Sequence, residues 1–500
     1  MSSCPSWRTC LGNTRGRERT TVTGDGARFD MVVIGAGPAG EKAATHAAYF
    51  GKRIALVERE ELLGGVVVNS GGVPSKTLRE TALYVTGFRK RDIYGVELRL
   101  DRAAALQVMH ERTSDVMRLM AGRVRANLER HRVEVVRGEA RLAGPHHVTV
   151  RTDDGERTLE GEVILVATGS HPLRPGSLPF DDPAIVDSDA LLAALGDIDS
   201  MVVMGGGVIG CEYASILNAL GVTVTLVDMA PRLVPLLDSE LSTVLAKTFE
   251  QHGVRLRLGT GVDSVVRVAT RIAVTLTDGE RIEADRMLVA VGRRGNTGSL
   301  RLREAGVELD AHGLVKVDAN LRTTCPSIYD AGDVIGPPTL ASVAVEEGRR
   351  AASSAFGTRL HEGHFFQAPI GVYTVPEIGQ IGMTEKQAVS QGIDHVIGRA
   401  RFADNARATI AGSTEGLVKL ICNRTDGALL GVHVLGEIAA EIVHIGQAVL
   451  QHGGTVDYLI HATFNVPTWS DALKYAAFDA LQQLERGAPP WRPEVARSVS

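Results

Sequence analysis

Cysteine is scarce in this sequence, and no two cysteines lie close enough to suggest a redox pair. None of the five stands in a C-x-x-C or C-x-x-x-x-C arrangement; they are Cys4, Cys10, Cys211, Cys325 and Cys422. An odd, scattered set excludes the disulfide framework of a small secreted protein. It also leaves no neighbouring pair of thiols for thiol–disulfide exchange.

Aromatic residues, an excess of one charge and long apolar runs are missing as well. Aromatics make up 4% of the chain, which disfavours an aromatic-packed β-sandwich. The net charge of −5 is not the basic field of a nucleic-acid-binding protein. No apolar run approaches the ~18 residues that a membrane span needs. We therefore expect a cytoplasmic protein that binds neither nucleic acid nor a membrane.

Glycine, in contrast, is abundant, with 55 among 500 residues, against about 7% on average. The length predicts roughly three domains of ~150 residues. Short β-branched runs alternate with helical stretches, which is typical of parallel sheets covered by helices on both faces. From about residue 364 the pattern changes, and residues 416–421 and 431–435 read as adjacent strands of an α+β domain.

The first of two glycine-rich turns follows an apolar strand at residues 31–34. Gly35, Gly37 and Gly40 form a G-x-G-x-x-G motif ahead of an alanine-rich helix, and Glu58 ends the next strand 23 residues after Gly35. Such glycines permit a tight turn, the approach of a pyrophosphate and close helix–strand packing, while the helix N-terminus offers free N–H groups. With an acidic residue placed for an adenosine ribose, the pattern predicts a dinucleotide site.

The second turn repeats this arrangement. Gly205, Gly207 and Gly210 follow an apolar strand, and Asp228 ends the next strand, again 23 residues after the first glycine. An acidic side chain there accepts from the ribose 2′-hydroxyl and repels a 2′-phosphate, which favours NAD over NADP. Arg232, four residues later, is either a phosphate contact or a solvated surface arginine.

Both ends of the chain lack apolar periodicity. Residues 1–28 hold five arginines and many Ser, Thr and Gly, without the apolar core of a signal peptide. We expect a disordered extension here, with a start codon placed too early and a transit peptide as alternatives. Residues 487–500 are Pro-rich and are expected to form a loose tail.

Taken in order, the motifs over residues 29–486 resemble those of the two-dinucleotide flavoprotein disulfide reductase superfamily. Besides the two glycine turns they are Pro74-Ser75-Lys76, Ala167-Thr168-Gly169, Val291-Gly292-Arg293 and Ala331-Gly332-Asp333. The resemblance implies an α/β fold with two Rossmann-like domains and a C-terminal α+β dimerisation domain. It divides the chain into an FAD-binding domain (29–169 and 290–360), an NAD(P)-binding domain (170–289) and a dimerisation domain (364–486).

Two departures from the superfamily concern its thiol chemistry. Where disulfide-reducing relatives carry a Cys-x-x-x-x-Cys pair, this chain has Val67 and Gly72, neither of which forms a thiolate. Where they carry a His-Pro-Thr motif near the C-terminus, this chain has Val466 before the proline, and valine is neither an acid nor a base. The departures imply a flavoprotein that does not reduce disulfides by that mechanism.

Within the superfamily, the chain is most similar to the soluble pyridine nucleotide transhydrogenases, in residues 207–215, 292–297, 331–336, 340–342, 371–377, 441–447 and 463–468. That family usually keeps the first cysteine of the pair, so Val67 departs from it too. The resemblance implies hydride transfer between NADPH and NAD⁺ through FAD. Two alternatives remain: an NAD(P)H dehydrogenase that reduces quinones, dyes or oxygen, and a non-catalytic nucleotide-binding subunit. FAD, NAD(H) and NADP(H) are the implied cofactors, and a homodimer or larger homo-oligomer is the implied assembly.

The resemblance places the chemistry at Lys76 and Glu212, an ion pair expected beside the flavin and the nicotinamide. A positive charge near flavin N5 stabilises the electron density that arrives with a hydride, and the carboxylate neutralises the ammonium. Val208 stands where several disulfide reductases have a tyrosine lid, so it either opens the nicotinamide face or only packs the helix start.

Asp333 is expected to bind the ribityl chain of FAD. The other implied FAD contacts are Gly35, Gly37, Pro38, Ala39, Gly40, Glu58, Arg59, Gly64, Gly65, Val66, Val67, Lys76, Thr168, Gly169, Gly332, Leu340 and Ala341. The implied NAD(P) contacts are Gly205, Gly207, Val208, Ile209, Gly210, Asp228 and Gly292.

Two histidines stand outside these assignments. His444 falls on the same face of an expected helix as Glu441, which fits a helix-packing pair at least as well as a catalytic role. His461 is the second candidate. No spacing of His, Cys, Asp or Glu resembles a metal site, and we expect no bound metal.

Overall fold

The computed structural model describes residues 27–87, 102–196, 198–358 and 367–486. The expected tail at 487–500 and residues 1–26 of the expected N-terminal extension lie outside these ranges. Strand β1 (Ala27–Ile34) begins two residues before the expected boundary, because Ala27 and Arg28 pair with Leu159 and Glu160 of strand β6.

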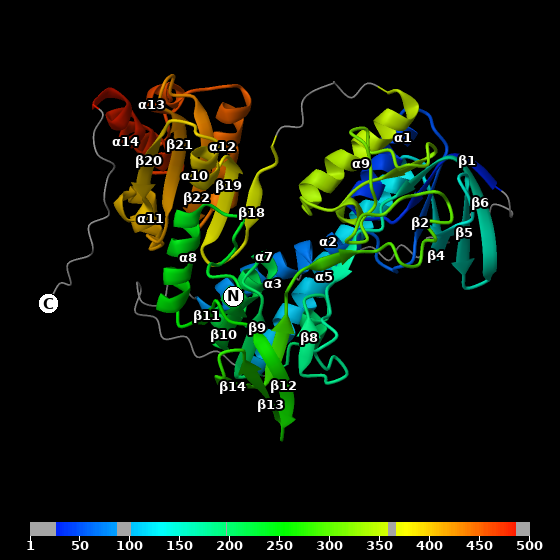
Figure 1. Cartoon of the computed structure of the whole chain (residues 1–500), viewed down its shortest axis with the longest axis horizontal. Coiled ribbons are helices and arrows are strands. Elements are labelled where there is room, and N and C mark those ends of the chain that lie inside the picture. Colours follow the sequence, from blue (N-terminus) through cyan, green and yellow to red (C-terminus); the bar gives the residue numbers. More distant parts are fainter. Residues whose placement is uncertain (1–26, 88–101, 197, 359–366, 487–500) are drawn as a thin grey trace, which may run out of the picture.

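The first domain, at the right of Figure 1, is built on a seven-stranded sheet in the order β3-β2-β1-β6-β5-β4, with β17 also paired to β6. Strands β1, β2, β3, β6 and β17 run parallel, and β5 pairs antiparallel with both β6 and β4. The remaining strands are β2 (Ile54–Glu58), β3 (Glu134–Arg137), β4 (Glu139–Leu142), β5 (His147–Thr152), β6 (Gly155–Val166) and β17 (Ile328–Asp330).

Helices α1 (Pro38–Tyr49) and α9 (Ala341–Phe356) pack together on one face of this sheet. Their contact is made by small residues: a Cβ at Gly348 would clash with the carbonyl oxygen of Ala39. Helix α9 follows β17 in the chain, so a segment some 300 residues distant completes the first domain. Helices α2 (Gly65–Asn69), α3 (Gly72–Thr86) and α5 (Arg102–Arg130) extend from it toward the second domain.

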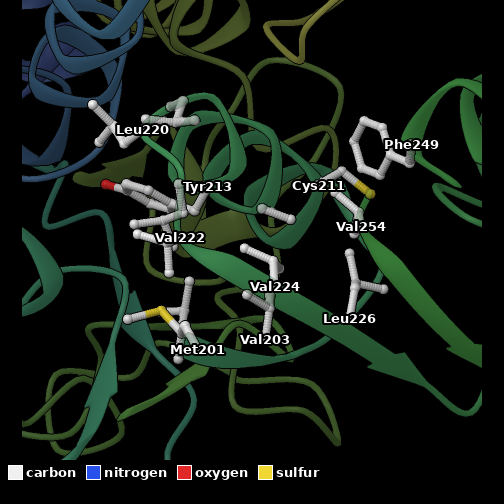
Figure 2. Close-up of a cluster of buried hydrophobic side chains, with 14 of the residues drawn as sticks. Met201, Val203, Cys211, Tyr213, Leu220, Val222, Val224, Leu226, Phe249 and Val254 are labelled. Carbon is white, nitrogen blue, oxygen red and sulfur yellow. The ribbon is translucent and has the colours of Figure 1, made fainter. Parts of the chain in front are cut away.

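The second domain has a parallel five-stranded sheet in the order β11-β10-β9-β15-β8 and an antiparallel three-stranded sheet, β12-β13-β14. Figure 2 shows its core, in which Val203 and Val224 of adjacent strands face Cys211 and Tyr213 of helix α7, with Phe249 of α8 beside Cys211. The elements are β8 (Ile185–Asp187), α6 (Leu191–Ala194), β9 (Ser200–Met204), α7 (Val208–Ala219), β10 (Thr223–Asp228), α8 (Ser239–Gln251), β11 (Arg255–Leu258), β12 (Val262–Val268), β13 (Arg271–Leu276), β14 (Arg281–Ala284) and β15 (Arg286–Val289).

The two domains are joined by a two-stranded antiparallel sheet, β7 (Ser170–Pro172) with β16 (Arg293–Gly295). The chain leaves the first domain through β7 and returns through β16. This small sheet therefore fixes one domain against the other.

The C-terminal domain, at the left of Figure 1, is an antiparallel five-stranded sheet in the order β18-β19-β22-β21-β20. Helix α12 packs on β19 and β22, and α14 packs on β20 and β21. Its elements are β18 (Ile370–Val372), β19 (Glu377–Gly382), α10 (Glu385–Ser390), β20 (His395–Arg401), α11 (Ala406–Ala411), β21 (Leu417–Asn423), β22 (Leu429–Gly436), α12 (Ala439–Gln451), α13 (Val456–His461) and α14 (Ala472–Arg486).

The fold class expected from the sequence is confirmed: two Rossmann-type domains with parallel sheets, followed by an antiparallel α+β domain. Among the described residues, no helix combines the length and the apolar character needed to cross a membrane.

Candidate active site

The first glycine turn contains glycines of two kinds. A Cβ at Gly35 would clash with the carbonyl oxygen of Ala167, and one at Gly40 would clash with that of Gly35. The fold itself therefore excludes side chains at these two positions. Gly37 has an ordinary φ of −68°, and the atom nearest to an added Cβ is Cα of Gly65, 3.9 Å away. Since the fold does not require glycine at position 37, the bare backbone there fits a ligand that approaches the helix N-terminus.

The second turn repeats these contacts. Gly205 has a φ of +117° and faces the carbonyl oxygen of Ala290, while a Cβ at Gly210 would clash with the carbonyl oxygen of Gly205. Gly207 has an ordinary φ of −77°, and no atom of the described residues lies within 4 Å of an added Cβ. Again only the middle glycine is free of packing constraints.

Each turn is tied to the acidic residue that ends the following strand. Glu58 Oε2 accepts from the N–H of Ala36 at 2.8 Å, and its Oε1 accepts from the N–H of Arg59 at 2.8 Å. Asp228 accepts from the N–H of Gly206 in the same way. A carboxylate therefore stands beside each turn, where an adenosine ribose binds in dinucleotide folds.

A cavity of about 960 Å³ is lined by residues of all three domains. It brings together most of the residues expected to contact FAD and three expected at the nicotinamide side: Gly35, Gly37, Pro38, Ala39, Glu58, Arg59, Gly65, Val66, Val67, Lys76, Thr168, Gly169, Gly332, Asp333, Leu340, Ala341, Val208, Ile209 and Glu212. The expected site residues outside its wall are Gly40, Gly64, Gly205, Gly207, Gly210, Asp228 and Gly292. Gly40 and Gly210 are accounted for by packing inside their turns.

The expected ion pair forms in the cavity wall. Lys76 Nζ lies 2.7 Å from Glu212 Oε2, because α3 and α7, which carry them, pack against each other. The Glu212 side chain is 6% exposed and that of Lys76 is 34% exposed. The carboxylate is therefore buried behind the ammonium, which faces the cavity.

Tyr373, which the sequence did not single out, completes this wall. Its backbone N–H donates to Glu212 Oε1 at 2.9 Å, and its ring centre lies 4.8 Å from Lys76 Nζ, within the range of a cation–π contact. Burial, reinforced by the carboxylate of Glu377, raises the pKa of the Tyr373 phenol, which keeps it neutral. Its only sequence signal is its place in the transhydrogenase-like segment 371–377.

The positions that replace the cysteine pair adjoin each other in the same wall. A Cβ at Gly72 would lie 3.1 Å from Cγ1 of Val67. Three cysteines fall among the described residues, and all are free and buried: Cys211, Cys325 and Cys422. Burial raises the pKa of Cys422 to about 12, and burial together with nearby carboxylates raises that of Cys211 further. These two thiols do not ionise at ordinary pH.

Helix α12 adds a histidine to the cavity. His444 lines it, and its Nδ1 lies 2.8 Å from Oε1 of Gln447. His444 therefore has a hydrogen-bond partner one turn further along α12, and the expected packing pair with Glu441 stays a prediction. Val466 and His461 are exposed, and neither belongs to the cavity wall.

A buried lysine lies outside the cavity wall, among three carboxylates. Lys419 Nζ lies within 3.0 Å of the carboxylates of Asp238, Glu240 and Glu385. This group of acids has the spacing of a metal site, but the Lys419 ammonium already lies among the three carboxylates. The contact joins α8 of the second domain to the C-terminal sheet.

Asp330 is a buried carboxyl group that also lies outside the cavity wall. It ends β17, and neither of its carboxylate oxygens has a hydrogen-bond partner among the described residues. Burial raises the pKa of Asp330 well above its usual range, and the nearby N–H of Ala331 offsets only part of the rise. No element of the sequence pattern indicated this group.

Comparison with protein families matches two models in sequence. Residues 29–348 match the pyridine nucleotide-disulphide oxidoreductase family, and residues 368–477 match the dimerisation domain of that family. Among curated proteins, the chain is 41% identical to a soluble pyridine nucleotide transhydrogenase of Mycobacterium bovis, over 91% of this chain and 98% of that protein. It is 37% identical to one of Erwinia tasmaniensis over the same shares.

Solved structures of similar fold include LpdA from Mycobacterium tuberculosis, with a TM-score of 0.83 and 29% identity over 90% of this chain and 99% of that chain. The HOCl-induced flavoprotein disulfide reductase RclA from Escherichia coli follows, with a TM-score of 0.80 and 27% identity over 89% of this chain and 98% of that one. The chain is therefore a member of the pyridine nucleotide-disulphide oxidoreductase family, a family of flavoprotein enzymes that bind FAD and pyridine nucleotides.

Proposed function

We propose that this protein is an FAD-dependent transhydrogenase, which moves hydride between NADPH and NAD⁺ without a redox-active dithiol. One observation carries the proposal: the cavity wall holds the Lys76–Glu212 pair, while the adjoining positions that hold a dithiol in disulfide-reducing relatives are Val67 and Gly72. The names of the relatives at 37–41% identity support the choice of substrates.

The residues of the cavity fit FAD. The unobstructed backbone at Gly37 and the N-terminus of α1 would hold the pyrophosphate, and Glu58 would accept from the adenosine ribose. Asp333 would accept from the ribityl hydroxyls. When bound, FAD supplies a centre that takes a hydride from one nicotinamide nucleotide and gives it to the next.

The chain's own contribution is positioning and charge. Hydride transfer requires the two rings in contact rather than a general acid. Lys76 presents a positive charge to the cavity, Glu212 limits the cost of burying it, and the Tyr373 backbone orients Glu212. We assign no acid–base role to His444.

Nicotinamide nucleotides would bind at the second turn, with the phosphates at Gly207 and the adenosine ribose at Asp228. Val208 and Ile209 begin α7 and also line the cavity, so this helix runs from the phosphate site to the reaction site. The expected domain boundaries follow from this assignment, with residues 170–289 as the NAD(P)-binding domain.

The C-terminal domain would pair two copies of the chain. Tyr458, Tyr475 and Phe478 are large apolar side chains exposed on α13 and α14, as at an interface between subunits. Sedimentation at nanomolar concentration should show a dimer or a larger homo-oligomer.

The test is a set of anaerobic assays on the purified protein. NADPH with an NAD⁺ analogue should give rapid nucleotide-to-nucleotide transfer, and NADPH with a small disulfide should release no thiols. Fast turnover with a quinone but none between nucleotides would replace the transhydrogenase assignment with a dehydrogenase. A bound flavin that NADPH fails to bleach would indicate a non-catalytic subunit.

A further inference from the structure

The strands that join the two domains carry a chain of hydrogen bonds from one domain to the other. It begins at Asp189, just after β8 of the second domain, and passes through Arg293 of β16 and Ser170 of β7. It ends at Asp333, the first residue of a short 3₁₀ helix (Asp333–Ile335) that follows β17 of the first domain. All four residues line the cavity.

The hydrogen bonds in this series span 2.6 to 2.9 Å. Arg293 Nη1 donates to Asp189 Oδ1 at 2.9 Å, and its Nε donates to Ser170 Oγ, also at 2.9 Å. Its Nη2 reaches the Ser170 carbonyl oxygen at 2.9 Å, so one guanidinium holds both the side chain and the backbone of that serine. Ser170 Oγ in turn donates to Asp333 Oδ2 at 2.6 Å.

The chemistry of the serine fixes the direction of the chain. A hydroxyl has one proton to donate. Because Ser170 Oγ accepts from the always-charged Arg293, its own proton is committed to Asp333. Among the described residues no hydrogen bond is made to Asp333 Oδ1, which is left to accept from a ligand.

Burial strengthens these hydrogen bonds. Ser170 is buried, and the side chains of Arg293 and Asp189 are 13% and 29% exposed. Charge-assisted bonds shielded from water are stronger than exposed ones. Arg293 pairs directly with the Asp189 carboxylate and is linked to the Asp333 carboxylate through Ser170, so removing any member leaves a partly buried group without its partner.

We propose that Ser170 and Arg293 are positioning residues that hold Asp333 as the acceptor for FAD hydroxyls. Through them, the affinity for FAD depends on Asp189 in the NAD(P)-binding domain. The proposal rests on the assignment of FAD to the cavity. Its consequence is that a residue of one nucleotide-binding domain sets the affinity of the other domain for its cofactor.

The test compares two neighbouring arginines of the same short strand. The Arg293 side chain donates hydrogen bonds in this series, whereas the Arg294 side chain is exposed and serves as the matched control. The FAD dissociation constant of each deflavinated, reconstituted variant is measured by flavin fluorescence, with the visible circular dichroism of the bound flavin as a second readout. Arg293→Met should raise the constant at least tenfold and alter the flavin spectrum. Arg293→Lys should lie between it and the wild type, and Arg294→Met should stay within twofold of the wild type.

Three further variants keep the proposal testable if Arg293→Met does not fold. Ser170→Ala should weaken FAD binding, Ser170→Thr should restore it because the hydroxyl is retained, and Asp189→Asn should weaken it about threefold from the other domain. Unchanged FAD affinity in Ser170→Ala and Asp189→Asn would overturn the proposal. Failure of the wild type itself to bind FAD would instead overturn the proposed function.

Discussion

The two glycine turns share their internal contacts but differ in their surroundings. In both, the first and third glycines are excluded from bearing side chains by backbone carbonyls, and a carboxylate at the end of the next strand accepts from the turn. Around the first turn, a Cβ at Gly65 would lie 2.8 Å from Cα of Gly37, and Gly35 and Gly37 line the cavity. Around the second, no atom in the described part of the chain lies within 4 Å of a Cβ at Gly207, and none of the three motif glycines belongs to the cavity wall.

The different surroundings of the two turns correspond to the two kinds of nucleotide in the proposed function, a bound cofactor and an exchanging substrate. An enclosed turn, with α2 against it and the segment of Asp333 beside it, suits a cofactor that stays bound. An open turn suits a substrate that must leave in every cycle. In the proposed function, the turn motif recognises the phosphates, while the neighbouring segments determine how long each nucleotide stays bound.

The largest effect is expected where the two turns are alike. Gly40→Ala and Gly210→Ala place a methyl group on a backbone carbonyl, so each should cost about 3 kcal/mol of folding free energy, as overpacking does. Urea unfolding measures it. Gly122→Ala, at an exposed position of α5 with no atom within 4 Å of the added methyl, is the control and should be neutral or slightly stabilising. Equal stability of all three variants would show that the close contacts are not real.

Lys76→Met tests the role of the ion pair that lies where the first two domains meet. The change removes the charge that faces the cavity and leaves Glu212 buried with the Tyr373 N–H as a remaining donor. Flavin reduction by NADPH should slow by about 10²-fold, or roughly 2.7 kcal/mol. Stopped-flow absorbance measures the rate. Lys52→Met, at the surface of the first domain, should leave it unchanged, and an unaffected rate in Lys76→Met would remove the ion pair from the mechanism.

Asp330 is a feature of the first domain, and Asp330→Ala should stabilise the protein. An unpartnered buried carboxyl costs about 1–3 kcal/mol. Because the folded-state pKa is raised, the folded state holds the proton more tightly, so stability falls as pH rises from about 4, the unfolded pKa, through the folded value. The gain from the alanine should therefore grow with pH over that window. Asp330→Asn, which cannot ionise, should show the same loss of pH dependence, and parallel pH curves for wild type and variants would contradict this account.

The middle glycines separate the two ligands. Gly37→Ala and Gly207→Ala meet little resistance from the fold, so both proteins should keep wild-type stability. Gly37→Ala should weaken FAD binding about tenfold and Gly207→Ala should weaken NADH binding about tenfold, or 1.4 kcal/mol each. Equilibrium titrations measure both constants for each variant. Loss of both ligands in either variant would contradict the assignment of one ligand to each turn.

The smallest effect concerns the two carboxylates. Asp228→Asn keeps an acceptor for the Gly206 N–H but removes the charge that repels a 2′-phosphate. The ratio of NADPH to NADH affinity should rise about threefold to tenfold. Glu58→Gln, the equivalent change at the first turn, should leave this ratio unchanged, and the same rise in both variants would deny Asp228 its role in nucleotide choice.

Local patterns were sufficient to predict the strands that flank the two turns, the turns themselves and the acidic residues that follow them, because each of these sequence patterns lies within about 25 residues. The Lys76–Glu212 pair spans 136 residues, and its prediction came from resemblance rather than from spacing. Tyr373, Ser170 and Arg293 were not identified as site residues, since their roles arise only when β7 pairs with β16 and when the C-terminal domain meets α7.

The assignment of an enclosed cofactor and an exchanging nucleotide is tested most directly by anaerobic double-mixing stopped flow. The protein, freed of unbound FAD by gel filtration, is mixed first with one equivalent of NADPH and then with excess NAD⁺, while flavin and NADH absorbance are followed. We expect the flavin absorbance to bleach on addition of NADPH. It should then recover as NADH forms in an amount equal to the NADPH consumed, with FAD bound throughout. A flavin that fails to bleach, or that stays reduced when NAD⁺ is added, would contradict the assignment.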